Sequence, residues 1–375
     1  MVPPFCPNPR CAHHFDEPGH YHGHWKHDGF YETLVVGTVP RFRCLSCGRG
    51  FSERTFSIDY YTKRRLDLRE IHRAVSQSES LSSIGRHLGC SAESVQNRID
   101  RLSRNALAMH GQLLSGLRLS EHLVADGFES FDRSQYFPNQ INLLVGQQSQ
   151  YLYGLTHATI RRKGRMTRHQ KQVREQLEQV YRAPRNAVET SFARLLDTIP
   201  ALWDPSTLPR LRLWTDEHYA YPLSIRRVTA LARAQAENTF LHQTWPSTAP
   251  RTVLNPLFPV NYYDRELRKD IAAFRRESTC YTRNAANGLA RFMAHLVYHN
   301  YQKPHRVGQG RQTVEVHAEM AGIPKGSIAG CLLWFYSARP FLSKQPLSSE
   351  ARRIWLKEAL TPLKVGQSYL PMYAR

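Results

Sequence analysis

The sequence lacks any long uninterrupted run of apolar residues. No stretch reaches the roughly 18 to 20 uncharged apolar residues that a helix needs to cross a bilayer. The opening residues, MVPPFCPNPRCAHH, also lack the apolar core of a secretory signal peptide. We therefore expect a soluble, cytoplasmic protein with no membrane partner. The 375 residues are 41% hydrophobic, which is enough to bury a core and suggests two to four domains.

Acidic residues are scarce relative to basic ones. The chain has 31 Asp and Glu against 51 Lys and Arg, a formal net charge of +20. An excess of this size is more than solubility requires. It predicts a polyanion as partner, with a merely basic surface as the alternative.

Cysteine is also rare, but it is clustered. Four of the seven cysteines fall in the first 47 residues: Cys6, Cys11, Cys44 and Cys47. Two short knuckles of this kind can each deliver two thiolates to a tetrahedral zinc ion, and in a reducing compartment such clustering favours metal over disulfide. Between the knuckles, FYETLVVGTVPRFRC suggests two strands that meet near Gly37. We predict a zinc ribbon over residues 1–58, with four free thiols in a loop as the alternative.

Residues 62–110 follow a helical pattern. Apolar residues recur at helical spacing in three stretches, and Gly89 and Ser91 supply a stop and a cap between the second and the third. This is the helix-turn-helix pattern, whose second helix lies in the DNA major groove. We expect that helix to present five contacting side chains: Ser94, Gln96, Asn97, Arg98 and Arg101. A plain helical packing module is the alternative.

Strand-like runs and charged helices alternate over residues 118–305, which predicts an α/β domain, and residues 306–375 look like a helical tail. LSEHLVADGFESF reads as a buried strand ending at Asp126, and LPRLRLWTDEHYAY as a strand ending at Asp216. Two carboxylates on neighbouring strand ends could hold a divalent cation, because Mg²⁺ prefers hard oxygen ligands. Two unrelated turn aspartates are the alternative.

A third acid is expected from NYYDRELRKDIAAFRRESTCYTRN, read as a helix over 264–279. Its apolar residues mark one buried face: Leu267, Ile271 and Phe274. At 100° per residue, Asp264 points toward this face and Glu266 toward solvent. Asp264 is therefore the preferred ligand, Glu266 its rival and Glu277 a more distant one. An aspartate favoured only by the helix dipole is the alternative.

Arginine and lysine gather at two further places. The helix over 264–279 carries three arginines that we expect to grip DNA: Arg268, Arg275 and Arg276. Two further strands are read in FPNQINLLVG and YLYGLTHATI. A second basic group follows the latter, where it could bind phosphate or form a solvated basic loop: Arg161, Arg162, Lys163, Arg165, Arg168 and Lys171.

Taken in order, these motifs resemble bacterial insertion-sequence transposases that carry an N-terminal zinc ribbon, a helix-turn-helix and a DDE/DDD catalytic domain of the ribonuclease H-like fold. The resemblance covers nearly the whole chain. It rests on the four clustered cysteines, the turn at Gly89, VADG with Asp126, WTDEHY with Asp216, and DRELRKD…RRESTCYTR followed by YHNYQKPHR. In such enzymes the third acid is usually glutamate, whereas the best-placed acid of this chain is Asp264.

The resemblance implies that Asp126, Asp216 and Asp264 position two Mg²⁺ or Mn²⁺ ions for in-line phosphoryl transfer, cleaving and joining the ends of an insertion sequence. It implies structural Zn²⁺ in the ribbon, and double-stranded DNA as partner, both terminal inverted repeats and target. It also implies a homodimer or higher oligomer on DNA, associated with the bacterial nucleoid. Two alternatives stay open: a transposase-derived, sequence-specific DNA-binding regulator without catalysis, and a nuclease of the same fold that cuts without joining.

Overall fold

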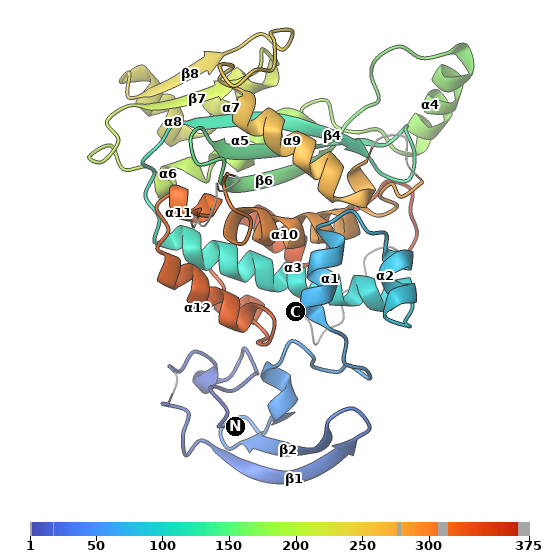
Figure 1. Cartoon of the computed structure of the whole chain (residues 1–375), viewed down its shortest axis with the longest axis vertical. Coiled ribbons are helices and arrows are strands. Elements are labelled where there is room, and N and C mark those ends of the chain that lie inside the picture. Colours follow the sequence, from blue (N-terminus) through green and yellow to red (C-terminus); the bar gives the residue numbers. More distant parts are fainter. Residues whose placement is uncertain (1, 18, 276–278, 307–313, 367–375) are drawn as a thin grey trace.

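A three-stranded antiparallel sheet forms the N-terminal part of the computed structural model, which describes residues 2–17, 19–275, 279–306 and 314–366 (Figure 1). Its strands pair in chain order: β1 Trp25–Thr33, β2 Gly37–Cys44 and β3 Gly50–Ser52. Short 3-10 turns flank the sheet at Ala12–His14 and Glu53–Phe56. The β1–β2 hairpin turns at Gly37, as predicted, and Gly37 has a φ of 71° that favours glycine.

Three helices follow the small sheet: α1 Leu68–Val75, α2 Leu81–His87 and α3 Ala92–Ser115. Each helix is preceded by a residue whose side chain accepts hydrogen bonds from backbone N–H groups of the first turn. These residues are Asp67, Ser80 and Ser91. The predicted stop at Gly89 and cap at Ser91 are both present. However, α3 has 24 residues and continues well beyond the predicted helix-turn-helix.

A mixed five-stranded sheet forms the centre of the chain, so the predicted α/β class is confirmed. Its strands run in the order β6-β5-β4-β7-β8. Their bounds are β4 Leu123–Phe131, β5 Pro138–Gly146, β6 Leu152–Thr159, β7 Leu211–Thr215 and β8 Phe240–Thr244. The first three strands pair antiparallel, whereas β7 runs parallel to β4 and β8 parallel to β7. Since β5 is buried from Asn139 to Gly146, both faces of the sheet are covered at its centre.

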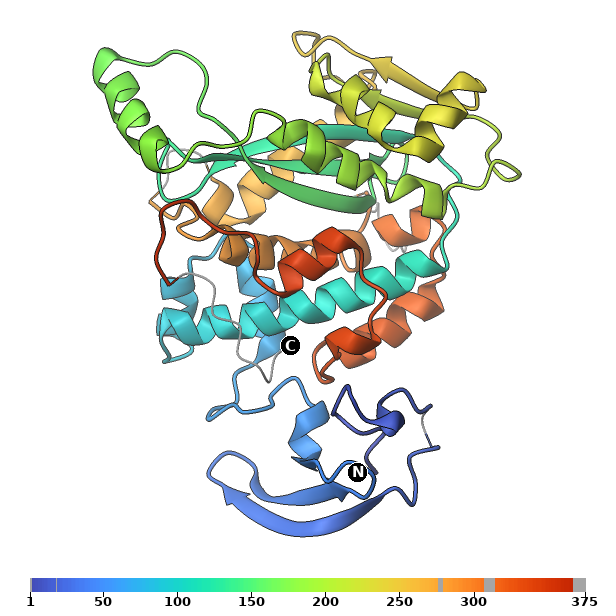
Figure 2. The same cartoon turned by 180° about the vertical axis from the view of Figure 1, so that it is seen from behind.

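Helices cover the sheet on both sides. In Figure 1 α9 crosses the near face, and in Figure 2, from behind, α5 does so. The helices between and after the strands are α4 Arg168–Val180, α5 Ala187–Leu196, α6 Ile199–Leu202, α7 Ala220–Arg227, α8 Thr229–Ala236, α9 Phe258–Asp270 and α10 Ala285–Tyr301. The helix predicted to reach residue 279 ends at Asp270, because Ile271 is extended and a 3-10 turn then buries Phe274 against Phe128.

The C-terminal part is helical, as expected: α11 His317–Met320, α12 Lys325–Phe335, a 3-10 turn at Leu342–Lys344, and α13 Ser349–Trp355. Helices α10, α12 and α13 pack against α3. One hydrophobic core therefore runs from Ile58 to Ala359 and includes residues of the three helices, the central sheet and the C-terminal helices. The ribbon keeps a small cluster of its own. No helix in the described ranges is both long and apolar enough to span a bilayer.

Candidate metal centres

Four thiols converge in the N-terminal sheet. The sulfurs of Cys6 and Cys47 are 3.6 Å apart and those of Cys11 and Cys44 are 3.8 Å apart, and all four lie within 4.8 Å of one another. A tetrahedral zinc ion with Zn–S bonds of about 2.3 Å requires sulfur separations of about 3.8 Å. The predicted set therefore fits a single metal ion such as zinc.

Two tight turns and an aromatic wall position these thiols. The turn after β2 closes where Gly48 donates its N–H to the Cys44 carbonyl over 3.0 Å. Tyr21, Phe42 and Phe51 pack around the sulfurs. Burial raises the pKa of the Cys44 thiol, but hydrogen bonds from Tyr21 and from backbone N–H groups outweigh it and lower that pKa to about 6. Burial instead raises the pKa of the Cys6 and Cys11 thiols, so Cys44 ionises more readily than those two.

The ribbon is docked on the C-terminal segment. A hydrogen bond of 2.6 Å joins His14 to Ser343, and Lys344 donates to the His14 carbonyl over 2.9 Å. The ammonium of Lys344 also lies 3.8 Å from the centre of the Phe5 ring. These contacts hold residues near the first knuckle against residues that follow α12.

Asp126 and Asp216 lie on neighbouring parallel strands. Because Leu123 pairs with Leu213 and Val124 with Trp214, the same register two residues further on brings the two aspartates side by side. Burial and the Asp216 carboxylate raise the pKa of Asp126 to about 7. The prediction that β4 ends at Asp126 is wrong, since β4 continues to Phe131, but β7 does end just before Asp216.

Asp264 lies on α9, which packs against β4, and its charge acts on the same tyrosine, Tyr221, as those of Asp126 and Asp216. The hydroxyl of Tyr221 donates to Oδ1 of Asp126 over 3.4 Å. Burial and the charges of Asp126, Asp216 and Asp264 raise the pKa of Tyr221 well above its usual value. The negative charges of all three carboxylates therefore act on the Tyr221 hydroxyl.

The carboxylates are less tightly grouped than the thiols. Within the described part of the chain, only the four cysteines offer three or more metal-binding atoms that all lie within 4.8 Å of one another. Mg²⁺ keeps several waters in its shell and uses only one or two protein carboxylates directly. The three carboxylates do not form such a group within 4.8 Å, although carboxylate oxygens are the ligand type that Mg²⁺ or Mn²⁺ takes.

Glu266 does not point toward solvent, so that prediction is wrong. It is 3% exposed, lies 3.2 Å from Nδ1 of His299 and forms an ion pair with Lys303. Burial raises its pKa, but His299 and Lys303 together hold the pKa below its usual range. The side of α9 that carries Glu266 is covered by α10 and the residues after it, which the apolar pattern of α9 alone does not reveal.

The arginines that were predicted to grip DNA from this region differ in their exposure. Arg268 is half-buried, donates to the Glu129 carbonyl over 3.1 Å and lies over the Phe128 ring at 4.4 Å, so it braces β4. Arg275 is exposed. Arg276 and Glu277 lie outside the described residues.

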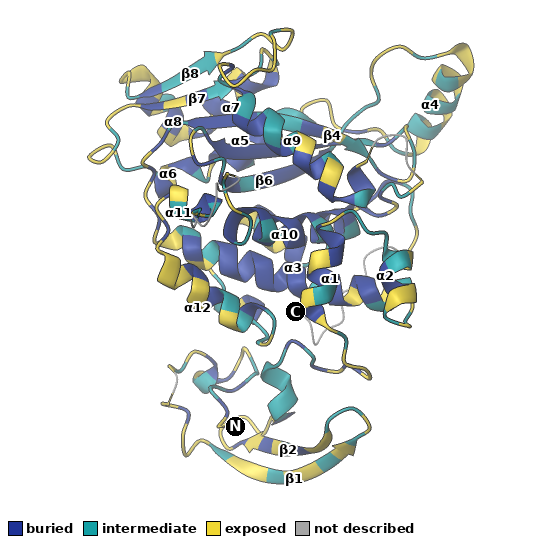
Figure 3. Ribbon diagram, viewed as in Figure 1, coloured by how far each residue is buried: buried dark blue, intermediate teal, exposed yellow. Residues whose placement is uncertain are grey.

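Helix α3 is buried over most of its length (Figure 3), and three of the five side chains predicted to face DNA from it are buried. Gln96 accepts a hydrogen bond from Arg291 of α10, Arg98 donates to the Arg64 carbonyl over 2.7 Å, and Arg101 donates to the Ile58 carbonyl over 2.6 Å. The outward orientation expected of these three is wrong, because α10 and the segment before α1 cover that face of α3. Only Asn97, which is exposed, and Ser94, which is half-buried, stay accessible.

Two residues near the carboxylates were not predicted. Tyr221 lies five residues after Asp216, and its aromatic type after WTDEH was a usable signal. Arg251 lies in the loop between β8 and α9, and its charge lowers the pKa of Asp126. No local pattern marks Arg251, since only the fold brings that loop to β4.

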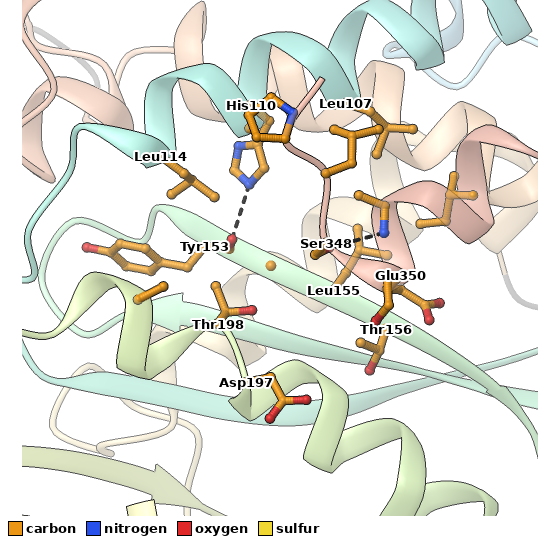
Figure 4. Close-up of a pocket in the computed structure, with 18 of the residues that line it drawn as sticks. Leu107, His110, Leu114, Tyr153, Leu155, Thr156, Asp197, Thr198, Ser348 and Glu350 are labelled. Atoms are coloured by element: carbon orange, nitrogen blue, oxygen red, sulfur yellow. Dashed lines mark hydrogen bonds between the residues drawn. The ribbon is translucent and has the colours of Figure 1, made fainter. Parts of the chain in front are cut away.

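A cavity of about 570 Å³ lies elsewhere, between α3, β6 and the residues before α13 (Figure 4). Its walls are largely apolar and include Leu107, Leu114 and Leu155. His110 donates to the Tyr153 carbonyl at its edge over 3.1 Å. Neither the carboxylates nor the thiols line it, so it is separate from both candidate metal centres.

No protein-family model matches this chain, and a search of curated proteins finds no significant match. The function is therefore inferred from the geometry of the two centres and from the charge of the chain.

Proposed function

We propose that the protein is a metal-dependent DNA phosphoryl transferase of the insertion-sequence DDE/DDD transposase type. The observation that carries the proposal is the β4–β7 register, which sets Asp126 beside Asp216 although 90 residues separate them. Asp264 is the third acid in this proposal. Glu266 is not, because Lys303 already pairs with its charge and His299 contacts its carboxylate on the α10 side of α9.

The sheet supports assigning the central region to the ribonuclease H-like fold. Three antiparallel strands are followed by β7 and β8, both parallel to the first strand of the sheet, and the acids lie on β4 and directly after β7. This arrangement gathers carboxylates from distant parts of the chain at one place, as two-metal chemistry requires.

The residues of the carboxylate centre have different roles in this proposal. Asp126, Asp216 and Asp264 would hold the ions, which when bound would activate a water or a DNA 3′-hydroxyl and stabilise the leaving oxygen. Tyr221 orients the Asp126 carboxylate through its hydrogen bond. Arg251 adds positive charge next to Asp126, where a phosphate has to approach.

Other parts of the chain would bind the DNA outside the centre. The proposal assigns this to the zinc ribbon, to the accessible Ser94 and Asn97, and to the exposed Arg275. The net charge of +20 supports a polyanionic substrate. The buried Gln96, Arg98 and Arg101 are assigned no role in DNA binding.

The test uses purified protein, Mg²⁺ or Mn²⁺, and a plasmid carrying the inverted repeats that flank the gene. We expect strand cleavage and joining that disappear in Asp126→Asn and in Asp216→Asn. Asp197→Asn, which changes an exposed aspartate at the end of α5, is the matched control and should retain activity. Repeat-specific binding without metal-dependent cutting by the native protein would instead favour the DNA-binding regulator, and cutting without joining would favour the nuclease.

A further inference from the structure

The segment of residues 160–186, here called the α4 arm, projects from the end of the central sheet. It connects β6 to α5 and stands apart from the other helices in both views (Figures 1 and 2). No residue of α4 itself is buried. The contacts that fix the arm lie at its base, where the Tyr181 ring meets the Phe137 ring at 6.4 Å. A helix that buries so little adds little to the folding of the sheet.

The charge of the α4 arm is almost entirely of one sign. It contains nine basic residues: Arg161, Arg162, Lys163, Arg165, Arg168, Lys171, Arg174, Arg182 and Arg185. Its acids are Glu175 and Glu178, so its net charge is nine minus two, or +7. Surface helices normally intersperse charges of both signs, and a strong field of one sign costs self-repulsion. A partner of opposite charge would offset that cost.

The fold uses few of these charges. Glu178 pairs with Arg161 at 2.6 Å and with Arg174 at 3.6 Å. Arg165, Arg168 and Lys171, by contrast, are exposed, and their side chains form no hydrogen bond or ion pair with the described residues. Arg168 and Lys171 are three residues apart on α4 and so share one face of the helix.

The base of the α4 arm lies beside the carboxylates. The ammonium of Lys163 is 5.8 Å from the centre of the Tyr219 ring. That ring stacks on His218 at 4.7 Å, and the His218 N–H donates to Oδ1 of Asp216 over 3.0 Å. The arm thus begins a few side chains from Asp216 and extends outward from it.

We propose that the α4 arm binds the phosphates of the DNA duplex as it extends away from the carboxylates, with Arg165, Arg168 and Lys171 as the contacting residues. Duplex DNA fits because its closely spaced phosphates match an exposed surface with excess positive charge and little apolar area. The inference rests on the proposed function only in taking DNA as the substrate at the carboxylates.

The test measures binding without catalysis. Fluorescence anisotropy with a labelled 40-base-pair duplex, in EDTA and over a range of salt concentrations, compares the native protein with Arg165→Gln/Arg168→Gln/Lys171→Gln. Loss of three phosphate contacts should lower the slope of log affinity against log salt by about 3 and raise Kd at least about tenfold. Circular dichroism and Tm should be unchanged, because these side chains make no contacts that the fold needs.

Two further variants control for charge alone. Arg210→Gln/Lys325→Gln/Arg352→Gln removes the same net charge from exposed residues away from the arm and should change Kd less than about twofold. Arg165→Lys/Arg168→Lys/Lys171→Arg keeps the charge of the arm and should restore native binding. Equal weakening by the two glutamine triples, or native binding by the arm triple, would overturn the inference.

The outcome is separable from that of the proposed function. If the arm triple loses DNA affinity selectively, the inference stands even for a protein that never cuts DNA. If the protein cuts DNA through Asp126 and Asp216 while the arm triple binds and cuts normally, the inference fails and the proposed function stands. An arm that selectively binds an acidic protein, with duplex affinity unaffected by the triple, would also overturn it.

Discussion

Tyr221 and Asp126 are joined by a hydrogen bond of 3.4 Å, donated by the phenol to a carboxylate 95 residues earlier in the chain. The Tyr221 ring is held from the other side by Phe192, stacked at 4.1 Å between ring centres. A rigid donor of this kind fixes one oxygen of Asp126 and leaves the other for a ligand. It also links α7 to the central strand on which the proposed chemistry depends.

Replacing Tyr221 with phenylalanine should therefore impair activity without unfolding the protein. The variant keeps the ring that stacks on Phe192 but loses the hydroxyl that donates to Asp126. Loss of this hydrogen bond should raise the activation free energy by about 1.4 kcal/mol, which lowers the rate about tenfold. Metal-dependent DNA cleavage under single-turnover conditions is the measurement. Tyr219→Phe, at an exposed neighbouring tyrosine, is the control and should cleave within about twofold of the native rate. An unaffected Tyr221→Phe would show that this hydrogen bond does not position Asp126.

The metal-free carboxylates should destabilise the fold. The pKa of Asp126 is about 7 in the folded protein, against 3.8 as its ordinary value, so folding favours the protonated acid. The stability that the protonated Asp126 contributes is then lost as the pH rises from about 4 to 7. Above pH 7 the folded protein bears the full cost of burying the ionised carboxylate. In EDTA at pH 8, Asp126→Asn should raise the free energy of unfolding by roughly 1–3 kcal/mol.

Urea unfolding at pH 5 and pH 8 measures this effect, which should be smaller at the lower pH. Added Mn²⁺ should stabilise the native protein and not the variant, because the ion supplies the missing positive charge. A variant that is less stable than the native protein at pH 8 would contradict the argument.

Neutralising Asp264 should impair activity and not stability, whereas neutralising Glu266 should impair stability. Glu266→Gln leaves Lys303 and His299 without their carboxylate in a buried site, which should cost about 3 kcal/mol of stability. Asp264→Asn should abolish metal-dependent cleavage while the Tm stays within about 2 °C of the native value. Thermal unfolding and cleavage are measured on both. An active Asp264→Asn would exclude Asp264 as the third acid, whatever the stability of Glu266→Gln.

The thiol cluster should hold one zinc ion per chain. Cys44→Ser removes one of four ligands, and we expect it to lose the metal and to destabilise the ribbon. Elemental analysis of the purified protein measures zinc directly. Cys90→Ser, at a cysteine between α2 and α3 that is not in the cluster, should keep a full equivalent. Zinc-free native protein purified without chelator would contradict this prediction.

Local patterns predicted most elements of the fold. The runs FPNQINLLVG and YLYGLTHATI correspond to β5 and β6, and the cap at Ser91 was visible in the sequence. The short strand β8 was missed, because FLHQT carries too few apolar residues to signal a strand. The paired knuckles predicted the thiol cluster because four cysteines in so short a segment have few other uses.

What the sequence could not predict depends on contacts between distant segments. Arg98 and Arg101 have the residue types of a DNA-reading helix, but their partners are carbonyls of Arg64 and Ile58, which no periodicity in α3 reveals. Glu266 was misplaced for the same reason, since α10 supplies its partners. By contrast, Asp126 and Asp216 were predicted to lie on neighbouring strands, and the parallel β4–β7 pairing bears this out, although β4 continues past Asp126.

The docking of the ribbon also has a consequence for how the protein is made. Ile58 donates its N–H to the Ser337 carbonyl, and His14 is held by Ser343 and Lys344. During synthesis residues 2–58 leave the ribosome well before their seat, which follows some 300 residues later in the chain. The ribbon must therefore wait, tethered, until residues 337–344 have been translated. Messages cut short before codon 337 would yield chains whose ribbon has no seat, so its correct placement reports that translation has passed this point.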